Sequence, residues 1–230
     1  MIKGPFDPSF EELPEVLAVF PLAGVLLLPG GRLPLNIFEP RYLNMTRDAM
    51  GAAGGGARMI GMVQPTGSGE TATGPALYRR GCAGRITSFA ETEDGRYLIT
   101  LTGVCRFNLG EELPLKDGYR RVIPDFRPFR RDLEEPAEEE DEAADIDRTR
   151  LIKLLEGYFK ARDIAVDWET IENMPDDELV TTLAMICPFD AGEKQALLEA
   201  ADLARRAGVL IACLEMAGRE AEGGAEITRH

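Results

Sequence analysis

Residues 82–108 read CAGRITSFAETEDGRYLITLTGVCRFN and hold the clearest β signal in the chain. The pair Asp94-Gly95 is flanked by two segments that resemble strands, 82–90 and 96–108. Asp-Gly is a strong hairpin turn, because glycine tolerates the positive φ that such a turn requires. In the second segment, every other position lies on one face of the predicted strand: Tyr97, Ile99 and Leu101. The stretch therefore predicts a β-hairpin within a β-rich region.

The residues around this hairpin favour further strands and one helix. The apolar run 16–28 predicts a buried strand or strand pair, which ends at Pro29-Gly30-Gly31. Pro40 suits the first position of a helix, and one face of that helix would carry Tyr42, Met45 and Ala49. A second apolar stretch covers 33–38, strands are expected at 58–64 and 118–124, and loops at 51–56 and 65–75.

An acidic segment separates this region from the rest of the chain. Residues 134–147 hold nine Asp or Glu residues, which favour a solvated linker or a frayed helix start. A second interpretation is an acidic arm that pairs with the arginines upstream, Arg120, Arg121, Arg127, Arg130 and Arg131. Exposed pairs of this kind are worth at most about 1 kcal/mol each. Residues 1–133 carry 16 Lys or Arg and 15 Asp or Glu, whereas residues 134–230 carry 10 and 25.

The last part of the chain has the spacing of helices. Apolar residues recur in three groups: Leu151, Leu154, Leu155 and Tyr158; Leu179, Leu183 and Ile186; and Leu203, Ala207, Leu210 and Leu214. Pro175 can open the second helix and Pro188 can end it, while Asp190 and Glu193 have capping-box spacing before another. Trp168, the sole tryptophan, is expected to be a packing anchor between helices. The sequence predicts an α+β fold with a β-rich region 1–133, an acidic linker 134–147 and a helical region 148–230.

Bulk composition limits the functions open to the chain. The 230 residues carry a net charge of −14, which disfavours binding to the phosphates of nucleic acid. Four cysteines lie far apart without a CxxC pair, and we expect them to be buried, reduced thiols. The apolar run 16–28 is interrupted by Pro21 and Gly24 and is shorter than the roughly 20 residues of a membrane span. The acidic residues before it are unlike a signal peptide, so we expect a cytoplasmic protein without a membrane partner.

The residues that common catalytic sites need are missing. The sole histidine is His230, so a Ser-His-Asp or Cys-His nucleophile has no base, and a histidine-rich metal site is excluded. The chain contains neither a GxxxxGK(S/T) P-loop nor a GxSxG nucleophile elbow. None of the five lysines is expected in the apolar surroundings that would lower its pKa for a Ser-Lys dyad. We therefore expect no catalytic residue, no metal and no cofactor.

Several short motifs together resemble one known family. They are VFPL (19–22), LLLPG (26–30), LPLNIFEPRY (33–42), GCAGRI (81–86), DGRY (94–97) and LTGVCRF (101–107), followed by PF (188–189) and EKQALLE (193–199). Their order and spacing resemble the N-terminal, substrate-binding domain of Lon-type proteases over most of residues 16–215. The segments IFEPRY and G..RF are the most specific of them.

The resemblance implies a fold and a class of activity. It implies a PUA-like β pseudo-barrel followed by a helical bundle, and a role in recognising a polypeptide substrate or protein partner. Compared with a complete Lon protease, the chain is expected to carry neither the ATPase nor the protease machinery. We therefore expect a free-standing, non-enzymatic recognition module, and nothing in the sequence indicates its oligomeric state.

Six residues of these motifs are candidates for peptide binding: Phe38, Glu39, Arg41, Tyr42, Arg106 and Phe107. Glu39 and Arg41 can form a structural pair that ties a strand to a helix, or they can line a binding cleft. Phe38 and Tyr42 are expected in the core rather than in contact with a ligand. For Arg106, a position that faces a groove and a purely structural position in its strand are equally expected. The predicted cleft lies where the barrel meets the helical bundle and is bounded by the IFEPRY segment.

Two other functions compete with polypeptide recognition. PUA-like barrels often bind RNA, and the arginine group between Arg120 and Arg131 could serve such a role, although little aromatic surface is interleaved with it. A hydrolase with an unfamiliar site is the other alternative.

Overall fold

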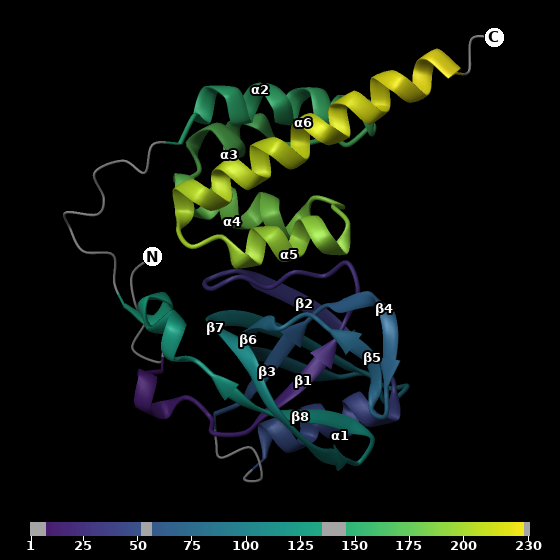
Figure 1. Ribbon diagram of the computed structural model, residues 1–230, viewed down its shortest axis with the longest axis vertical. Helices are drawn as coiled ribbons and strands as arrows, with labels where there is room; N and C mark the ends of the chain where they lie inside the picture. Colours follow the sequence, from purple (N-terminus) through teal and green to yellow (C-terminus); the bar gives the residue numbers. More distant parts are fainter. Residues whose placement is uncertain (1–7, 52–56, 135–145, 228–230) are drawn as a thin grey trace.

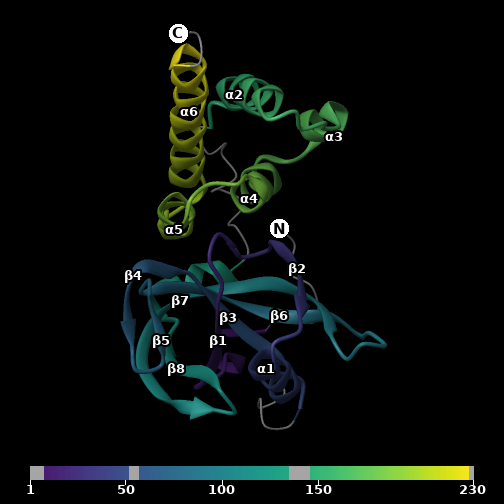
Figure 2. The ribbon, with the colours of Figure 1, turned by 90° about the vertical axis from the view of Figure 1, so that its right-hand side faces the viewer.

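The computed structural model describes residues 8–51, 57–134 and 146–227, with side chains up to Arg219. In Figure 1 the described chain forms two stacked parts, a sheet that curls around its own core and a group of helices above it. Both views place helix α1 (Pro40–Met50) at the end of the sheet that lies away from the other helices (Figures 1 and 2). All strands fall within residues 17–125 and all later α-helices within 148–227, so the predicted α+β class is confirmed.

Six strands form one sheet that closes on itself. They are β1 (Leu17–Pro21), β2 (Arg32–Ile37), β3 (Met59–Val63), β6 (Arg80–Glu91), β7 (Tyr97–Lys116) and β8 (Tyr119–Asp125). Their order is β2-β7-β6-β3-β1-β8, and β8 also pairs with β7. Strand β7 reaches three neighbours because it is 20 residues long: its first half pairs with β2 and β6, and its second half with β8. The predicted hairpin around Asp94-Gly95 is the β6–β7 pair.

A large aromatic side chain fills the interior of the closed sheet. Phe107 on β7 is fully buried, and its ring lies 5.8 Å from that of Phe126. A Cβ at Gly61 would lie 2.8 Å from the Phe107 ring, and a Cβ at Gly81 would lie 2.9 Å from it. These two glycines therefore leave the space that the ring occupies.

The prediction of a loop at 65–75 is wrong. Strands β4 (Pro65–Thr71) and β5 (Gly74–Leu77) form a separate two-stranded sheet there. Three of its glycines, Gly67, Gly69 and Gly74, have positive φ. These glycines suggested a loop. Their positive φ angles instead allow the register of this hairpin to shift between Pro65 and Glu70.

The apolar run 16–28 forms only one strand. Leu26, Leu27 and Leu28 are buried as predicted, but they lie outside the sheet in the connection from β1 to β2. Gly103 holds this connection, because Gly30 donates its N–H to the Gly103 carbonyl and Gly103 donates to Gly31. A Cβ at Gly103 would lie 1.9 Å from the Leu28 carbonyl oxygen, so the close approach needs a glycine there.

The helical region begins at residue 148. Its helices are α2 (Arg148–Ala161), α3 (Trp168–Asn173), α4 (Asp176–Ile186), α5 (Ala191–Glu199) and α6 (Leu203–Ile227). Pro175 precedes α4, and the capping box of Asp190 and Glu193 opens α5, as predicted. The sequence did not predict the short α3, whose first residue, Trp168, packs its ring 6.2 Å from that of Phe159. Ile186 was expected on a buried face but is 62% exposed at the end of α4.

Two short 3-10 helices flank the sheet region, Phe10–Glu12 and Arg127–Leu133. Between the second of these and α2, the acidic segment lies for the most part outside the described residues. Several of its suggested arginine partners already have other carboxylates: Arg120 pairs with Glu112, Arg127 with Asp125, and Arg130 with Glu11.

One hydrophobic core crosses from the sheet to the helices. It includes Leu27 and Ile37 from the sheet region and Leu183 and Leu197 from α4 and α5. Gly31 approaches α4 so closely that a Cβ there would lie 2.2 Å from the sulfur of Met185. The two parts are therefore packed against each other. Within the described part of the chain, every helix is too short or too polar to span a bilayer.

Candidate functional site

The segment that carries IFEPRY runs from the end of β2 into the first turn of α1. Ile37 takes the inward position at the end of β2, so the next side chain, Phe38, points outward and is 61% exposed. The prediction that Phe38 lies in the core is therefore wrong. The Arg96 guanidinium carbon lies 5.9 Å from the centre of its ring. Phe38 is available for contact with a partner.

Glu39 and Arg41 form the pair that the sequence suggested. The Arg41 Nε donates to Glu39 Oε2 at 2.9 Å, and the Arg41 Nη2 lies 2.7 Å from the same oxygen. Both side chains are close to half exposed. The pair lies at the junction of β2 and α1, because Glu39 caps the helix and Arg41 belongs to its first turn.

Tyr42 lies in the core, as predicted. It is 6% exposed, and its ring lies 4.2 Å from that of Phe20. The Arg41 guanidinium carbon sits 4.5 Å from the centre of the same ring, as in a cation–π contact. Burial raises the pKa of the Tyr42 phenol, so the hydroxyl keeps its proton near neutral pH.

A small pocket opens above Tyr42, where four distant segments meet. They are the end of β1, the first turn of α1, the β4–β5 hairpin and the β7–β8 turn. Its polar lining comes from Arg41, Tyr42, Thr73, Tyr119 and Arg120, and three prolines add apolar walls: Pro21, Pro65 and Pro75. The pocket is thus rich in hydrogen-bond donors. Sequence reasoning placed Arg41 and Tyr42 at a binding site but did not find the other three polar residues.

Strand β2 presents an open edge beside Phe38. Among the described strands, only β7 pairs with it. Gly103 donates to Gly31, and the register continues with Arg32 opposite Thr102. Antiparallel pairs alternate, so the backbone groups of Arg32, Pro34 and Asn36 point away from β7, and Pro34 has no N–H to offer. The side chains of these three residues are exposed.

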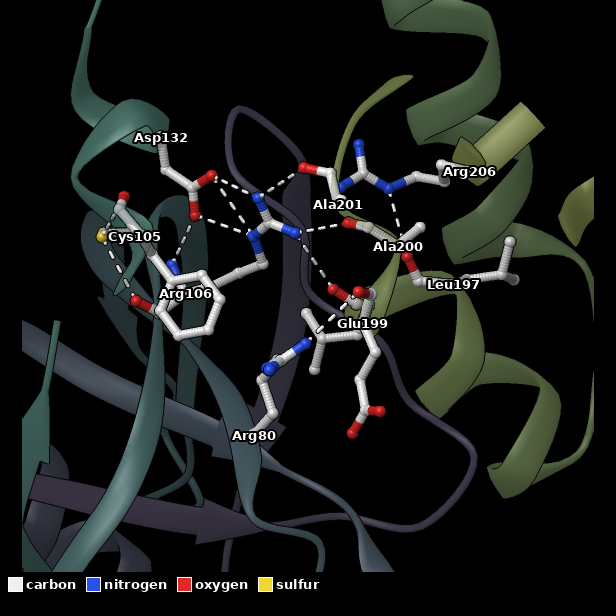
Figure 3. A network of polar contacts seen from close by, with 11 residues as sticks. Arg80, Cys105, Arg106, Asp132, Leu197, Glu199, Ala200, Ala201 and Arg206 are labelled. Carbon is white, nitrogen blue, oxygen red and sulfur yellow. Dashed lines mark hydrogen bonds and ion pairs between the residues drawn. The ribbon is translucent and has the colours of Figure 1, made fainter. Parts of the chain in front are cut away.

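Arg106 does not line an open groove (Figure 3). It is 7% exposed and forms a buried ion pair with Asp132, with 2.7 Å between Arg106 Nη2 and Asp132 Oδ1. Its Nη1 donates to the Ala200 carbonyl at 2.5 Å and to the Leu198 carbonyl at 3.4 Å. Arg106 therefore joins β7 to the connection between α5 and α6. Its neighbour Phe107 is fully buried inside the sheet, so neither side chain offers a surface to a peptide.

The predicted cleft is also wrong in its boundaries. The Arg106 contacts lie at the junction of sheet and helices, whereas the IFEPRY segment leads to α1 at the opposite end of the sheet (Figures 1 and 2). Sequence spacing could not separate the two places, because the motifs belong to paired strands: IFEPRY begins at the end of β2 and G..RF lies within β7.

Arg206 is a second buried arginine at this junction, which sequence reasoning did not single out. Its Nε donates to the Leu197 carbonyl at 3.2 Å, and the residue is 9% exposed. Burial and the positive charge of Arg106 lower the pKa of Arg206 to about 10, so it stays charged at neutral pH. Arg80 also crosses the junction and donates to the Glu199 carbonyl at 3.2 Å.

The described residues offer little for nucleophilic chemistry. All four cysteines are buried, as predicted, and burial raises their pKa values, to about 12 for Cys105 and Cys187. A buried thiol with a raised pKa is a poor nucleophile. Among the described residues, no group of His, Cys, Asp and Glu is arranged to hold a metal ion.

Lys194 corrects one sequence prediction. It is 4% exposed, and burial lowers its pKa, although no lysine was expected in apolar surroundings. Its Nζ donates to the Met185 carbonyl at 3.1 Å, which gives it a structural partner at the end of α4.

A closed sheet with an attached helical layer defines a class of domains seen in solved structures. A Lon N-terminal domain protein from Xanthomonas campestris matches with a TM-score of 0.55 and 24% identity, over 86% of this chain and 97% of that one. The N-terminal domain of the Mycobacterium avium complex Lon protease matches with a TM-score of 0.58 and 19% identity, over 87% and 98%. At these identities, the likeness shows the fold.

The chain belongs to the family of the ATP-dependent protease La (LON) substrate-binding domain, whose family model matches residues 16–215. A Lon protease from Parabacteroides distasonis is 27% identical over 207 residues, which are 88% of this chain and 24% of the protease. Lon protease 2 from Myxococcus xanthus is 29% identical over 102 residues, 44% of this chain and 12% of that protein. The chain thus spans less than a quarter of the length of these two curated relatives.

Proposed function

We propose that this chain is a non-catalytic module that recognises polypeptides. Its family is described as a substrate-binding domain, and the relatives that it matches are named as proteases, which act on polypeptide chains. The open edge of β2 beside the exposed Phe38 is the observation that carries the proposal. A strand edge can hydrogen-bond to any extended chain, and an adjacent apolar side chain adds affinity for unfolded segments.

The proposal includes the finer description of the fold and its setting. We propose that residues 1–133 are a PUA-like pseudo-barrel and residues 148–230 a helical bundle, joined by the acidic linker 134–147. The closure of the sheet through the β7–β8 pair, and the order of strands before helices along the chain, support this division. We also propose a cytoplasmic setting, where nascent or damaged polypeptides would be available.

The carboxylate partners of the arginine group argue against RNA as the partner. Arg120, Arg127 and Arg130 each pair with an acidic side chain within the described residues. Phosphate groups would have to compete with these carboxylates on a chain of net charge −14.

Binding of a permanently unfolded polypeptide tests the proposed function. We expect fluorescently labelled α-lactalbumin, reduced and carbamidomethylated, to bind the full chain. Phe38→Gln should weaken this binding about five- to tenfold, because an apolar contact of roughly 1 kcal/mol is lost. The melting temperature should not fall, since Phe38 is largely exposed. Fluorescence anisotropy measures the affinity.

Met216→Gln is the matched control for Phe38→Gln. Met216 is 47% exposed on α6, at the other end of the molecule from α1, so its loss should leave binding unchanged. Equal weakening by both substitutions would show that the polypeptide adheres to any exposed apolar residue, and the proposed site would be wrong.

Two substitutions on β2 test the strand edge itself. Pro34→Ala adds an outward N–H and should tighten binding, whereas Asn36→Pro removes one and should weaken it. Neither substitution removes a hydrogen bond to β7, because the backbone groups of both residues point away from that strand. If the two variants bind alike while both stay folded by circular dichroism, the polypeptide does not pair with this edge.

A further inference from the structure

The pocket above Tyr42 holds a hydroxyl that has no partner. Tyr42 is 6% exposed and lines the pocket, yet its hydroxyl makes no hydrogen bond to any described residue. The hydroxyl oxygen is open to solvent through the pocket, so a ligand there can replace water as its hydrogen-bond partner. The other tyrosine in the lining, Tyr119, is satisfied, since it donates to Asp48 at 2.7 Å. The Tyr42 hydroxyl is therefore a free donor in this pocket.

Arg41 adds positive charge at the same place. Its Nε and Nη2 hold Glu39 Oε2, which leaves Nη1 without a partner among the described residues. The guanidinium lies over the Tyr42 ring, with its carbon 4.5 Å from the ring centre. A ligand atom in the pocket can thus meet a hydroxyl and a guanidinium N–H from adjacent residues of one helical turn.

Arg120 is held rigidly behind these two donors. Its Nε and Nη2 bind the two oxygens of Glu112 at 2.7 and 2.9 Å, and its Nη1 donates to the Pro75 carbonyl at 2.7 Å. Arg120 is 6% exposed and links the β4–β5 hairpin to β8. The two carboxylates that pair with the arginines, Glu39 and Glu112, are not part of the lining. The wall that a ligand would meet therefore presents donors, and each of its two cations is paired with a carboxylate that lies outside the lining.

The apolar walls limit the kind of anion that fits. Three proline rings and the Tyr42 ring line the pocket beside the donors. Gly118 lets the β7–β8 turn approach α1 closely, because a Cβ there would come within 3.2 Å of the Arg41 Cβ. An anionic group attached to a carbon chain suits such walls better than a free, fully hydrated ion does.

We propose that this pocket binds a carboxylate carried by a polypeptide, with the Tyr42 hydroxyl and an Arg41 N–H as its donors. Charge-assisted hydrogen bonds of this kind are stronger than neutral ones and have clear directionality. The inference rests on the proposed function only for the class of partner, because the pocket is separate from the edge of β2. It adds selectivity for a chemical group to the recognition of an extended chain.

Three short fluorescent peptides of otherwise equal sequence test the proposal with the full chain. The first ends in a free carboxylate, the second in an amide, and the third in an amide with one internal aspartate. We expect the free carboxylate to bind about tenfold more tightly than the amide, as the loss of a charged hydrogen-bond acceptor predicts. Tight binding of the third peptide would show that an acidic side chain serves as well as the chain end. Equal affinity for all three peptides, or no binding of any, would overturn the proposal.

Tyr42→Phe and Tyr158→Phe form a matched pair of variants. Both remove a tyrosine hydroxyl that has no hydrogen-bond partner within the described part of the chain. The Tyr42 hydroxyl opens into the pocket, whereas that of Tyr158 is buried in α2, away from the pocket. Tyr42→Phe should abolish the preference for the acid over the amide, whereas Tyr158→Phe should keep it. A merely structural role of Tyr42 would change both peptides' affinities equally and leave the preference intact, which would contradict the proposal.

The same variants separate this proposal from the proposed function. If Tyr42→Phe loses the acid preference but still binds unfolded α-lactalbumin through β2, both ideas stand. If unfolded α-lactalbumin binds and the acid and amide peptides do not differ, the carboxylate site alone is wrong. If the acid preference is present while Phe38→Gln and the β2 variants bind as the unsubstituted chain does, the strand-edge function alone is wrong.

Discussion

Arg106 and Arg206 lie at the same buried junction but differ in their partners. Arg106 has Asp132 as an ion-pair partner, together with backbone carbonyls of the α5–α6 connection, whereas the Arg206 guanidinium makes a single hydrogen bond, to the Leu197 carbonyl, among the described residues. Removing one member of a buried ion pair leaves the other charge buried without a partner, where little water can solvate it. Removing a buried charge that has no ion-pair partner has no such consequence. The same substitution should therefore cost much more stability at Arg106 than at Arg206.

Arg106→Met should lower the free energy of unfolding by about 3–5 kcal/mol, because Asp132 would be left buried without its partner. Arg206→Met should change it by less than about 1 kcal/mol or raise it, since the methionine can fill the same space without a charge. Urea unfolding followed by circular dichroism measures both. Equal losses in the two variants would show that the ion pair with Asp132 does not make Arg106 the more costly of the two arginines to replace.

Helix α1 is tied to the β7–β8 turn by one carboxylate. Asp48 accepts a hydrogen bond from the Tyr119 hydroxyl at 2.7 Å and lies 2.7 Å from the Lys116 Nζ. The hydrogen bonds from Lys116 and Tyr119 lower the pKa of Asp48 below its usual value. This contact holds one wall of the pocket, because Tyr119 is part of the lining.

Asp48→Asn should destabilise the protein in a pH-dependent way. An aspartate whose pKa is lowered in the folded state stabilises it above the unfolded pKa, about 3.9, and loses this contribution as the pH falls through the folded value. The difference in melting temperature between the two proteins should thus be full at pH 7 and vanish at strongly acid pH. A difference that is constant with pH would mean that the charge of the Asp48 carboxylate contributes nothing to the contact.

The whole molecule should unfold as one unit. The larger of two hydrophobic clusters includes residues of the closed sheet and of helices α2, α4, α5 and α6, and the smaller one lies around Phe107 inside the sheet. Exposing either part would leave the other with a large apolar surface in water, which disfavours a state with one part unfolded. The polar contacts of Arg80 and Arg106 with the α5–α6 connection add to this coupling.

Trp168 provides a local probe for this prediction. It is the sole tryptophan and lies in α3, so its fluorescence reports on the helices, whereas amide hydrogen exchange of β6 and β7 reports on the sheet. Both should give the same free energy of unfolding in a urea series. A transition of Trp168 at clearly lower urea than the loss of protection in β7 would show that the helices unfold on their own.

Much of the secondary structure follows from local sequence. The β6–β7 hairpin, the start of α1 at Pro40 and the capping box before α5 are all as predicted, because turn glycines, prolines and caps act within a few residues. The failures share a cause. Leu26–Leu28 are apolar because they cover the core rather than because they form a strand, and the glycines of 65–75 belong to a twisted hairpin.

The sequence by itself determined the α+β class, the two regions of the chain and the segment IFEPRY as a place of interest. Only the tertiary structure decided that Phe38 faces solvent, that Arg106 is buried against Asp132, and that Tyr42 meets residues from three other segments in a pocket. The physical reason is that local conformation depends on neighbouring residues along the chain, whereas burial depends on how β7 curls to meet both β2 and β8. Sequence spacing does not encode that closure.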